Sequence, residues 1–149
     1  GLRYPDKYAV LCGGGHNHRR NLAEMLMLKD NHIDAAGSMT KAVELLRGRY
    51  NPCPPIEVEC RNLDEISEAV ACRVDRIMLD NMTPDMLPEA LEMIPSFIET
   101  EISGGVSLDT IRAYATVSTV RKPDFISVGR ITHSAVTADL SMRIAKESL

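Results

Sequence analysis

The chain has 149 residues, of which 44% are hydrophobic and 26% charged, and its net charge is −4. These values are typical of one globular domain, and the acidic balance does not favour nucleic-acid binding. The sequence contains no apolar run of the roughly 18 residues that a membrane-spanning helix needs. Its start lacks the apolar stretch of a signal peptide and has no methionine, which indicates an internal cut.

Four cysteines occur in the chain, and none of them forms a C-x-x-C pair. A zinc ribbon or a thioredoxin-type site is therefore not indicated. We interpret them as reduced thiols of a cytoplasmic protein. They are Cys12, Cys53, Cys60 and Cys72.

Short apolar runs alternate with segments of helical periodicity along the chain, which predicts repeated strand–helix units around a parallel sheet. The predicted strands cover 25–30, 56–60, 76–81, 97–103 and 125–130. The predicted helices cover 39–50, 63–74, 82–94 and 107–117, and a further one lies within 132–144.

Two of these helices carry recognisable start signals. Thr83 is the expected N-cap of the helix in 82–94, with Pro84 as its first helical residue and Asp85 in its first turn. Ser107 is the expected cap of the next helix.

A polar residue or glycine lies at or just past the carboxyl end of each predicted strand. In a parallel barrel these ends open on one face, where active sites are built. The sequence therefore predicts one site on a TIM-like, open parallel α/β barrel with fewer than eight strands. The residues that would meet there are Lys29, Glu59, Asp80, Ser103 and Gly129.

The types of these residues suit a phosphorylated sugar. Glu59 and Asp80 could bind Mg²⁺, or could contact ribose hydroxyls and stabilise positive charge at an anomeric carbon. The small-residue loop at 103–107 and the turn at Gly129 each precede a predicted helix, so their N–H groups could cradle phosphate.

A basic cluster begins at the stretch GGGHNHRRNL, which covers 13–22. Three glycines allow close backbone approach, and arginine matches the geometry of carboxylate or phosphate. The stretch is an anion site or a glycine-rich surface turn. His18, Arg19 and Lys29 form this basic half of the site, and His16, Arg20, Asn31 and His32 lie nearby in the sequence.

Six motifs in this order resemble the catalytic half of quinolinate phosphoribosyltransferases: GGGHNHR, LKDNHI, IEVEC, IMLDNMTP, EISGGVS and ISVGRITHSA. The resemblance runs from residue 1 to about 144. It implies an open α/β barrel without the N-terminal sandwich domain of the family. It also implies that an Arg/Lys/Thr-rich strand end, which family members carry immediately before the position of Gly1, is not part of this sequence. Residues 1–149 would then be one catalytic barrel segment, which we expect to be inactive alone.

The resemblance also implies the reaction and the partners. Members of that family transfer a phosphoribosyl group from phosphoribosyl pyrophosphate to the nitrogen of quinolinate. They then expel CO₂ to give nicotinate mononucleotide, a step of NAD biosynthesis. For this chain it implies a Mg²⁺ cofactor, a cytoplasmic homodimer or higher homo-oligomer, and neither nucleic acid nor membrane as a partner.

The resemblance assigns a role to each candidate residue. His18, Arg19 and Lys29 would hold the quinolinate carboxylates, while Glu59 and Asp80 would contact the ribose and its Mg²⁺. Lys29, Glu59 and Asp80 would be the catalytic residues. The residues around the 5-phosphate would be Ser103, Gly104, Gly105, Gly129 and His133.

Two departures and two alternatives accompany this interpretation. The segment 117–125 is longer than the family's usual turn, and Arg130 stands where a small or apolar residue is common. A metal-dependent hydrolase could use His16 and His18, completed by Lys29, His32 and Asp80. A non-catalytic binding or assembly subunit could retain the same barrel.

Overall fold

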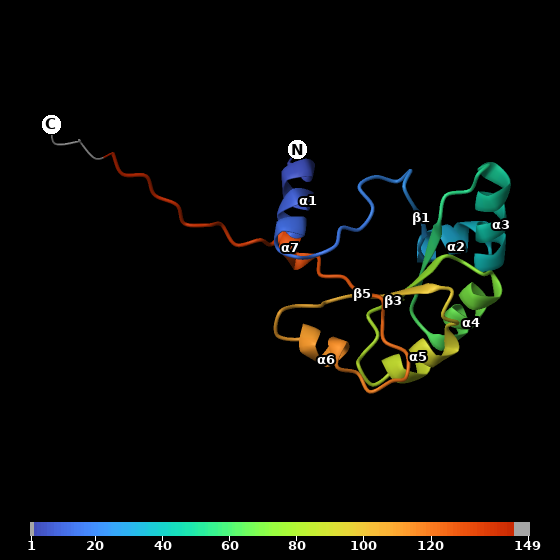
Figure 1. The fold of residues 1–149 in the computed structure, drawn as a ribbon. Helices are drawn as coiled ribbons and strands as arrows, with labels where there is room; N and C mark the ends of the chain where they lie inside the picture. Colours follow the sequence, from blue (N-terminus) through green and yellow to red (C-terminus); the bar gives the residue numbers. More distant parts are fainter. Residues whose placement is uncertain (1, 145–149) are drawn as a thin grey trace.

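The computed structural model describes residues 2–144 and contains five strands and seven helices (Figure 1). The strands are β1 (Leu26–Leu28), β2 (Ile56–Cys60), β3 (Arg76–Asp80), β4 (Glu99–Ser103) and β5 (Phe125–Ile126). The helices are α1 (Arg3–Cys12), α2 (Asp30–Ala36), α3 (Met39–Arg49), α4 (Leu63–Ala71), α5 (Leu87–Met93), α6 (Ile111–Ala115) and α7 (Arg130–His133).

All five strands form one parallel sheet in the order β1-β2-β3-β4-β5. Each strand pairs with the next one in sequence, without the reversal of order that marks a doubly wound sheet. The parallel α/β architecture is thereby confirmed, and it places every strand's carboxyl end at the same edge of the sheet.

Alternation along the strands gives the sheet an apolar face and a polar face. On β2, Ile56 and Val58 belong to the hydrophobic core, while Glu57 and Glu59 point the other way. Figure 1 shows α2 to α5 gathered on one side of the sheet and α1 standing apart from them. The core consists of the apolar strand face and the inner faces of α3, α4 and α5.

Side-chain caps start α3 and α4 at their expected places. Ser38 Oγ accepts the backbone N–H of Lys41 at 3.2 Å, and Asn62 Oδ1 accepts that of Glu65 at 2.9 Å. These bonds satisfy N–H groups that have no partner inside the helix. The sequence predicted strand 56–60 to the residue, and it extended the helix in 39–50 by one residue.

The expected start of α5 at Thr83 is wrong. Residues 83–86 form a turn closed by the Met86 N–H and the Thr83 carbonyl at 3.0 Å, and the helix begins at Leu87. A helix starting at Thr83 would hold Pro88 in its interior, where proline removes a hydrogen bond and clashes with the preceding turn. With the later start, Pro88 lies in the first turn.

The helix expected after Ser107 is also shorter than predicted. It covers only Ile111–Ala115, and its N-cap is Thr110. Ser107 instead lies at the start of the preceding turn, where its N–H donates to Thr110 Oγ1 at 2.9 Å.

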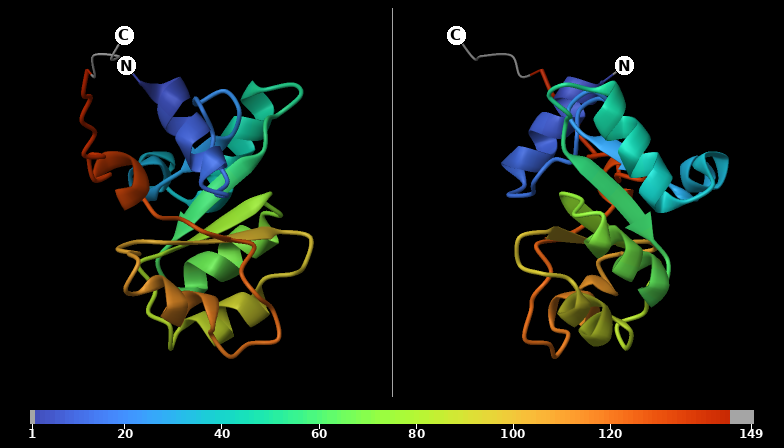
Figure 2. Two further views of the ribbon diagram at one scale, coloured as in Figure 1. Left: turned by 60° about the vertical axis from the view of Figure 1, so that its left-hand side comes forward. Right: turned by 90° about the vertical axis from the view of Figure 1, so that its right-hand side faces the viewer.

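The helix expected within 132–144 is reduced to the end of the short helix α7 (Arg130–His133). After α7, residues 135–144 have no regular structure and lead away from the sheet (Figure 2). Val136 and Leu140 are exposed there, so an amphipathic helix would have no apolar surface to pack against. The strand predicted at 125–130 is likewise reduced to the two residues of β5.

The long segment before β5 is anchored to the chain rather than loose. The Arg121 guanidinium donates to the carbonyls of Ile94, Pro95 and Ile98, and Lys122 Nζ donates to the Val117 carbonyl at 2.6 Å. None of the helices within residues 2–144 is both long and apolar enough to cross a membrane.

Candidate functional site

The five predicted strand-end residues lie along one edge of the sheet. Lys29 follows β1, Glu59 is near the end of β2, and Asp80 ends β3 directly opposite Ser103, which ends β4. Gly129 follows β5 and precedes α7. Because the strands are parallel, these residues share the edge at which parallel α/β proteins bind their ligands.

Lys29 and Glu59 form an ion pair at this edge. Lys29 Nζ donates to Glu59 Oε2 at 2.9 Å, and both side chains are partly exposed. Asp80 Oδ2 accepts a hydrogen bond from Asn81 Nδ2 at 2.8 Å. Within residues 2–144 the second oxygen of each carboxylate accepts no hydrogen bond. Such half-occupied carboxylates at neighbouring strand ends have the chemistry that Mg²⁺ or ribose hydroxyls require.

The loop after β4 packs tightly against the loop after β3. A Cβ atom at Gly104 would lie 2.3 Å from Asn81 Oδ1 and 2.7 Å from Asn81 N, and the φ of Gly104 is +100°. Gly105 also has a positive φ, of +61°. Only glycine tolerates such a close approach together with a positive φ. The N–H groups of Gly104 and Gly105 donate no hydrogen bond within residues 2–144, so they could face an anion.

Gly129 and His133 lie together at the start and end of α7. A Cβ atom at Gly129 would be 3.1 Å from His133 Nε2. The other ring nitrogen, Nδ1, is 2.7 Å from Ser134 Oγ. Since α7 has only four residues, it contributes a turn and an imidazole rather than a strong helix dipole.

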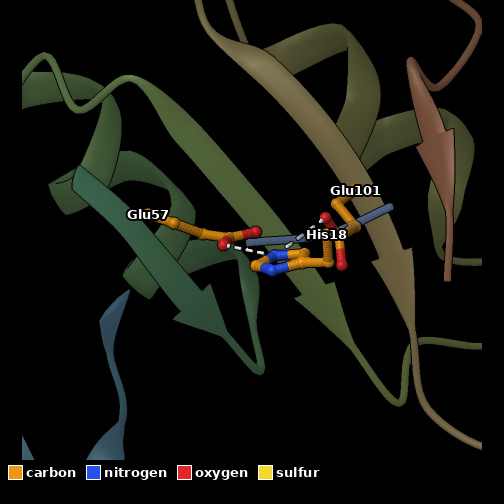
Figure 3. A group of neighbouring side chains, drawn as sticks. All are labelled: His18, Glu57 and Glu101. Atoms are coloured by element: carbon orange, nitrogen blue, oxygen red, sulfur yellow. Dashed lines mark hydrogen bonds and ion pairs between the residues drawn. The ribbon is translucent and has the colours of Figure 1, made fainter. Parts of the chain in front are cut away.

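His18 and Arg19 are not free at this edge. His18 Nε2 lies 2.9 Å from Glu57 Oε2 and 3.5 Å from Glu101 Oε2 (Figure 3). The Arg19 guanidinium donates to the Met25 carbonyl at 2.9 Å and approaches Met27 Sδ at 3.7 Å. The segment that carries both residues therefore crosses the polar face of the sheet, above the strands.

Four polar residues beneath His18 were missed by the sequence reasoning. Glu57 and Glu101 are buried, Ser127 Oγ donates to Glu101 Oε1 at 2.6 Å, and Arg76 Nη1 lies 3.3 Å from Glu101 Oε2. Burial raises the pKa of the Glu101 carboxyl, and the negative charge of Glu57 adds to that effect. The alternation in IEVEC and ETEIS, which puts glutamate on the polar face, was the available signal.

Only one group of three potential metal ligands occurs among the described residues, namely His18, Glu57 and Glu101. It includes neither His16 nor His32. His32 instead uses Nδ1 to accept the Lys29 N–H at 3.1 Å, at the start of α2. This arrangement does not support the alternative of a metal-dependent hydrolase.

Fold and site together define a parallel α/β domain with charged and glycine-rich groups at the carboxyl edge of its strands. Residues 1–143 match the family model of the C-terminal domain of quinolinate phosphoribosyl transferase. The chain belongs to this family.

Named relatives agree with the family assignment. The chain is 40% identical to a probable nicotinate-nucleotide pyrophosphorylase (carboxylating) of Bacillus subtilis, with 97% of the chain and 48% of the relative covered. It is 44% identical to a Synechocystis protein of the same description, with 98% and 49% covered. The chain thus spans about half the length of the curated relatives it matches.

Solved structures give the same result. The crystal structure of NadC from Streptococcus pyogenes superposes with a TM-score of 0.87 at 41% identity. The superposition covers 96% of this chain and 49% of that one. These comparisons give no support to a non-catalytic subunit.

Proposed function

We propose that this chain is the catalytic half of a quinolinate phosphoribosyltransferase, a pentosyltransferase of NAD biosynthesis. The reaction would transfer the phosphoribosyl group of phosphoribosyl pyrophosphate to the pyridine nitrogen of quinolinate. Pyrophosphate leaves the anomeric carbon, and CO₂ is then lost to give nicotinate mononucleotide. The observation that carries the proposal is the joint presence, at one strand edge, of the Lys29–Glu59 pair, Asp80 and the Gly104 loop in a member of this family.

The acidic half of the edge would act on the ribose. Glu59 and Asp80 each keep one carboxylate oxygen free of hydrogen bonds from residues 2–144, which supports contacts to hydroxyls or to Mg²⁺. Bound Mg²⁺ would neutralise pyrophosphate charge. The two carboxylates would stabilise positive charge that develops at the anomeric carbon as its bond to pyrophosphate breaks.

The basic half would orient quinolinate. Arg19 and Lys29 would bind its carboxylates, with His18 between them and the buried acids of the sheet. Lys29 is already held by Glu59 at 2.9 Å, so one residue pair links the sugar end of the site to the pyridine end. Such a link would support alignment of the attacking nitrogen with the anomeric carbon.

The 5-phosphate would be held at the far strand ends. The positive φ values of Gly104 and Gly105 support a loop whose N–H groups face an anion, with Ser103 beside them. Gly129 and His133 would complete the cradle from the neighbouring loop.

Cytoplasmic location and a homodimer or higher homo-oligomer complete the proposal. Reduced thiols support the location, since all four cysteines are free. Exposed apolar residues on α1, among them Tyr4 and Tyr8, support burial against further protein. Light scattering of the purified protein would test the oligomer, because a monomeric mass would contradict it.

Turnover is the direct test of the proposed function. The polypeptide as its gene encodes it would be incubated with phosphoribosyl pyrophosphate, Mg²⁺ and quinolinate labelled at the departing carboxylate. We expect labelled CO₂ and nicotinate mononucleotide in equal amounts, and neither product without phosphoribosyl pyrophosphate. A folded protein that releases no CO₂ under these conditions would contradict the proposal.

A further inference from the structure

Glu57 is a buried carboxylate with a single hydrogen-bond partner in the part of the chain that the structure describes. Its side chain is 0% exposed, and Oε2 lies 2.9 Å from His18 Nε2. Its other oxygen, Oε1, is buried and has no hydrogen-bond partner among residues 2–144. A buried, half-satisfied carboxylate costs folding stability. Its hydrogen bond to His18 is therefore the feature that can explain why a carboxylate is buried there.

The hydrogen bonds of His18 define its protonation. The Arg19 backbone N–H donates to His18 Nδ1 at 2.8 Å, so Nδ1 must be the unprotonated acceptor. Nε2 then carries the proton and donates to Glu57. The ring is thus held at both nitrogens, and it ties the Arg19 backbone to the middle of the sheet.

Glu101 supports the same ring from the other side. In Figure 3 the imidazole of His18 lies between Glu57 on β2 and Glu101 on β4, with Glu101 Oε2 at 3.5 Å from Nε2. Ser127 and Arg76 fix the Glu101 carboxylate through 2.6 Å and 3.3 Å contacts. Because the Arg76 guanidinium already lies 3.3 Å from Glu101 Oε2, a fixed cation is part of this network, and the geometry favours a support for His18 over a metal site.

We propose that Glu57 and Glu101 are positioning residues for substrate recognition, which fix His18 as the Nε2–H tautomer and thereby set the backbone and side chain of Arg19. The proposal rests on the proposed function, in which Arg19 binds a quinolinate carboxylate. Neither glutamate would touch the substrate. The Lys29 and Gly104 ends of the site would not depend on this network.

The test compares three variants of the protein as its gene encodes it. Glu57→Met preserves size but removes the acceptor, whereas Glu57→Gln keeps an oxygen that can accept from Nε2–H. Glu99→Met is the matched control, since Glu99 lies on the same face of β4 as Glu101 and contacts Arg76 at 2.6 Å but not His18. Steady-state KM values for both substrates and the melting temperature would be measured for each.

We expect Glu57→Met to raise the KM for quinolinate by roughly 10-fold to 100-fold, the effect of losing one hydrogen bond to a charged group. The KM for phosphoribosyl pyrophosphate should change by less than about twofold, which separates local positioning from a general loss. The melting temperature should stay or rise, because a buried half-paired charge is removed. Glu57→Gln should restore most of the quinolinate affinity, and Glu99→Met should behave like the wild type.

Three results would overturn the proposal. The KM for quinolinate could be unchanged in Glu57→Met, both KM values could rise in parallel, or Glu99→Met could raise the KM for quinolinate as much as Glu57→Met does. Absence of turnover in the wild type would instead refute the proposed function. In that case nitrogen NMR of the His18 ring still decides the positioning claim. A single Nε2–H tautomer, kept in Glu57→Gln and lost in Glu57→Met, supports it, and a proton on Nδ1 of the wild-type ring overturns it.

Discussion

The two faces of the sheet use the same strands for opposite purposes. On β2, Ile56 and Val58 are packed beneath the helices, while Glu57 and Glu59 face away from them and bind His18 and Lys29. The helix face gains free energy from apolar burial, whereas the polar face contains carboxylates that folding does not need. Along a strand of this sheet, alternate residues therefore serve the same function, either core packing or polar contacts, while adjacent residues serve different ones.

Truncation on the helix face should have the largest effect on stability. Ile77 is 0% exposed in the central strand β3. We expect Ile77→Ala to lower the free energy of unfolding by about 2–5 kcal/mol, the range for emptying a buried aliphatic site. Urea denaturation would measure it. The control is Ser103→Ala at the strand edge, which should change stability by less than about 0.5 kcal/mol. Equal losses of unfolding free energy in the two variants would contradict the claim that the helix face of the sheet, and not its carboxyl edge, stabilises the fold.

Neutralising the edge carboxylates should affect turnover rather than folding. Glu59→Gln and Asp80→Asn keep shape and remove charge, so each should weaken transition-state stabilisation by about 2–4 kcal/mol. Quinolinate binding and the urea midpoint should remain close to those of the wild type. Steady-state kinetics with calorimetric titration would separate these quantities. If binding and turnover fall equally, the carboxylates act on quinolinate instead of the ribose.

Arg19→Lys should cost quinolinate affinity although the charge is conserved. Lysine is a point charge and cannot reproduce the planar fork that pairs with a carboxylate. The expected loss is roughly 1.5–3 kcal/mol, the value of one hydrogen bond to a charged group. Phosphoribosyl pyrophosphate should bind nearly as before. Titrating both ligands measures the split, and a selective loss of the sugar phosphate would mean that GGGHNHRR is the phosphate loop.

The pH dependence of stability should have opposite signs at two carboxyls. Burial raises the pKa of Glu101, so the folded state holds that proton to higher pH than the unfolded chain, and its contribution falls as pH rises above about 4.5. Burial also acts to raise the pKa of Asp124. Hydrogen bonds from Thr100 and the charge of Arg121 outweigh that effect and lower the pKa. The stabilisation from Asp124 is therefore present at neutral pH and is lost in acid.

Denaturation between pH 3 and pH 7 (about four units, centred on the ordinary carboxyl range) would check this contrast. Relative to the wild type, Glu101→Gln should gain stability as pH rises, and Asp124→Asn should lose it. If the two difference curves have the same slope, the pKa of Glu101 is not raised in the folded protein.

Local sequence patterns predicted the sheet well but not every helix. Strand 56–60 was predicted to the residue, because its two alternating faces and flanking turn residues are local signals. The start of α5 could not be read from Thr83, since Pro88 excluded the longer helix. Helices α1 and α2 were missed. In α1, Tyr4, Tyr8 and Leu11 recur at helical spacing and were the available signal. Helix α2 has only seven residues, too few for a periodic pattern to stand out.

The candidate site likewise has a part that the sequence predicts and a part that it does not. The strand-end residues, from Lys29 to Gly129, follow from the repeat of strand and helix and could be predicted. The support beneath His18 could not, because it depends on where the segment before β1 crosses the sheet. Glu57 and Glu101 are 44 positions apart in the numbering and meet only through that tertiary arrangement.

The most direct test of how the strand edge is divided between the two substrates is a crystal structure. It would contain the protein as its gene encodes it, with quinolinate and a non-hydrolysable phosphoribosyl pyrophosphate analogue bound. We predict the pyridine carboxylates at Arg19 and Lys29, the ribose at Glu59 and Asp80, and the 5-phosphate on the Gly104 loop. A 5-phosphate seated on residues 13–20, with the pyridine ring at the Gly104 loop, would contradict this assignment.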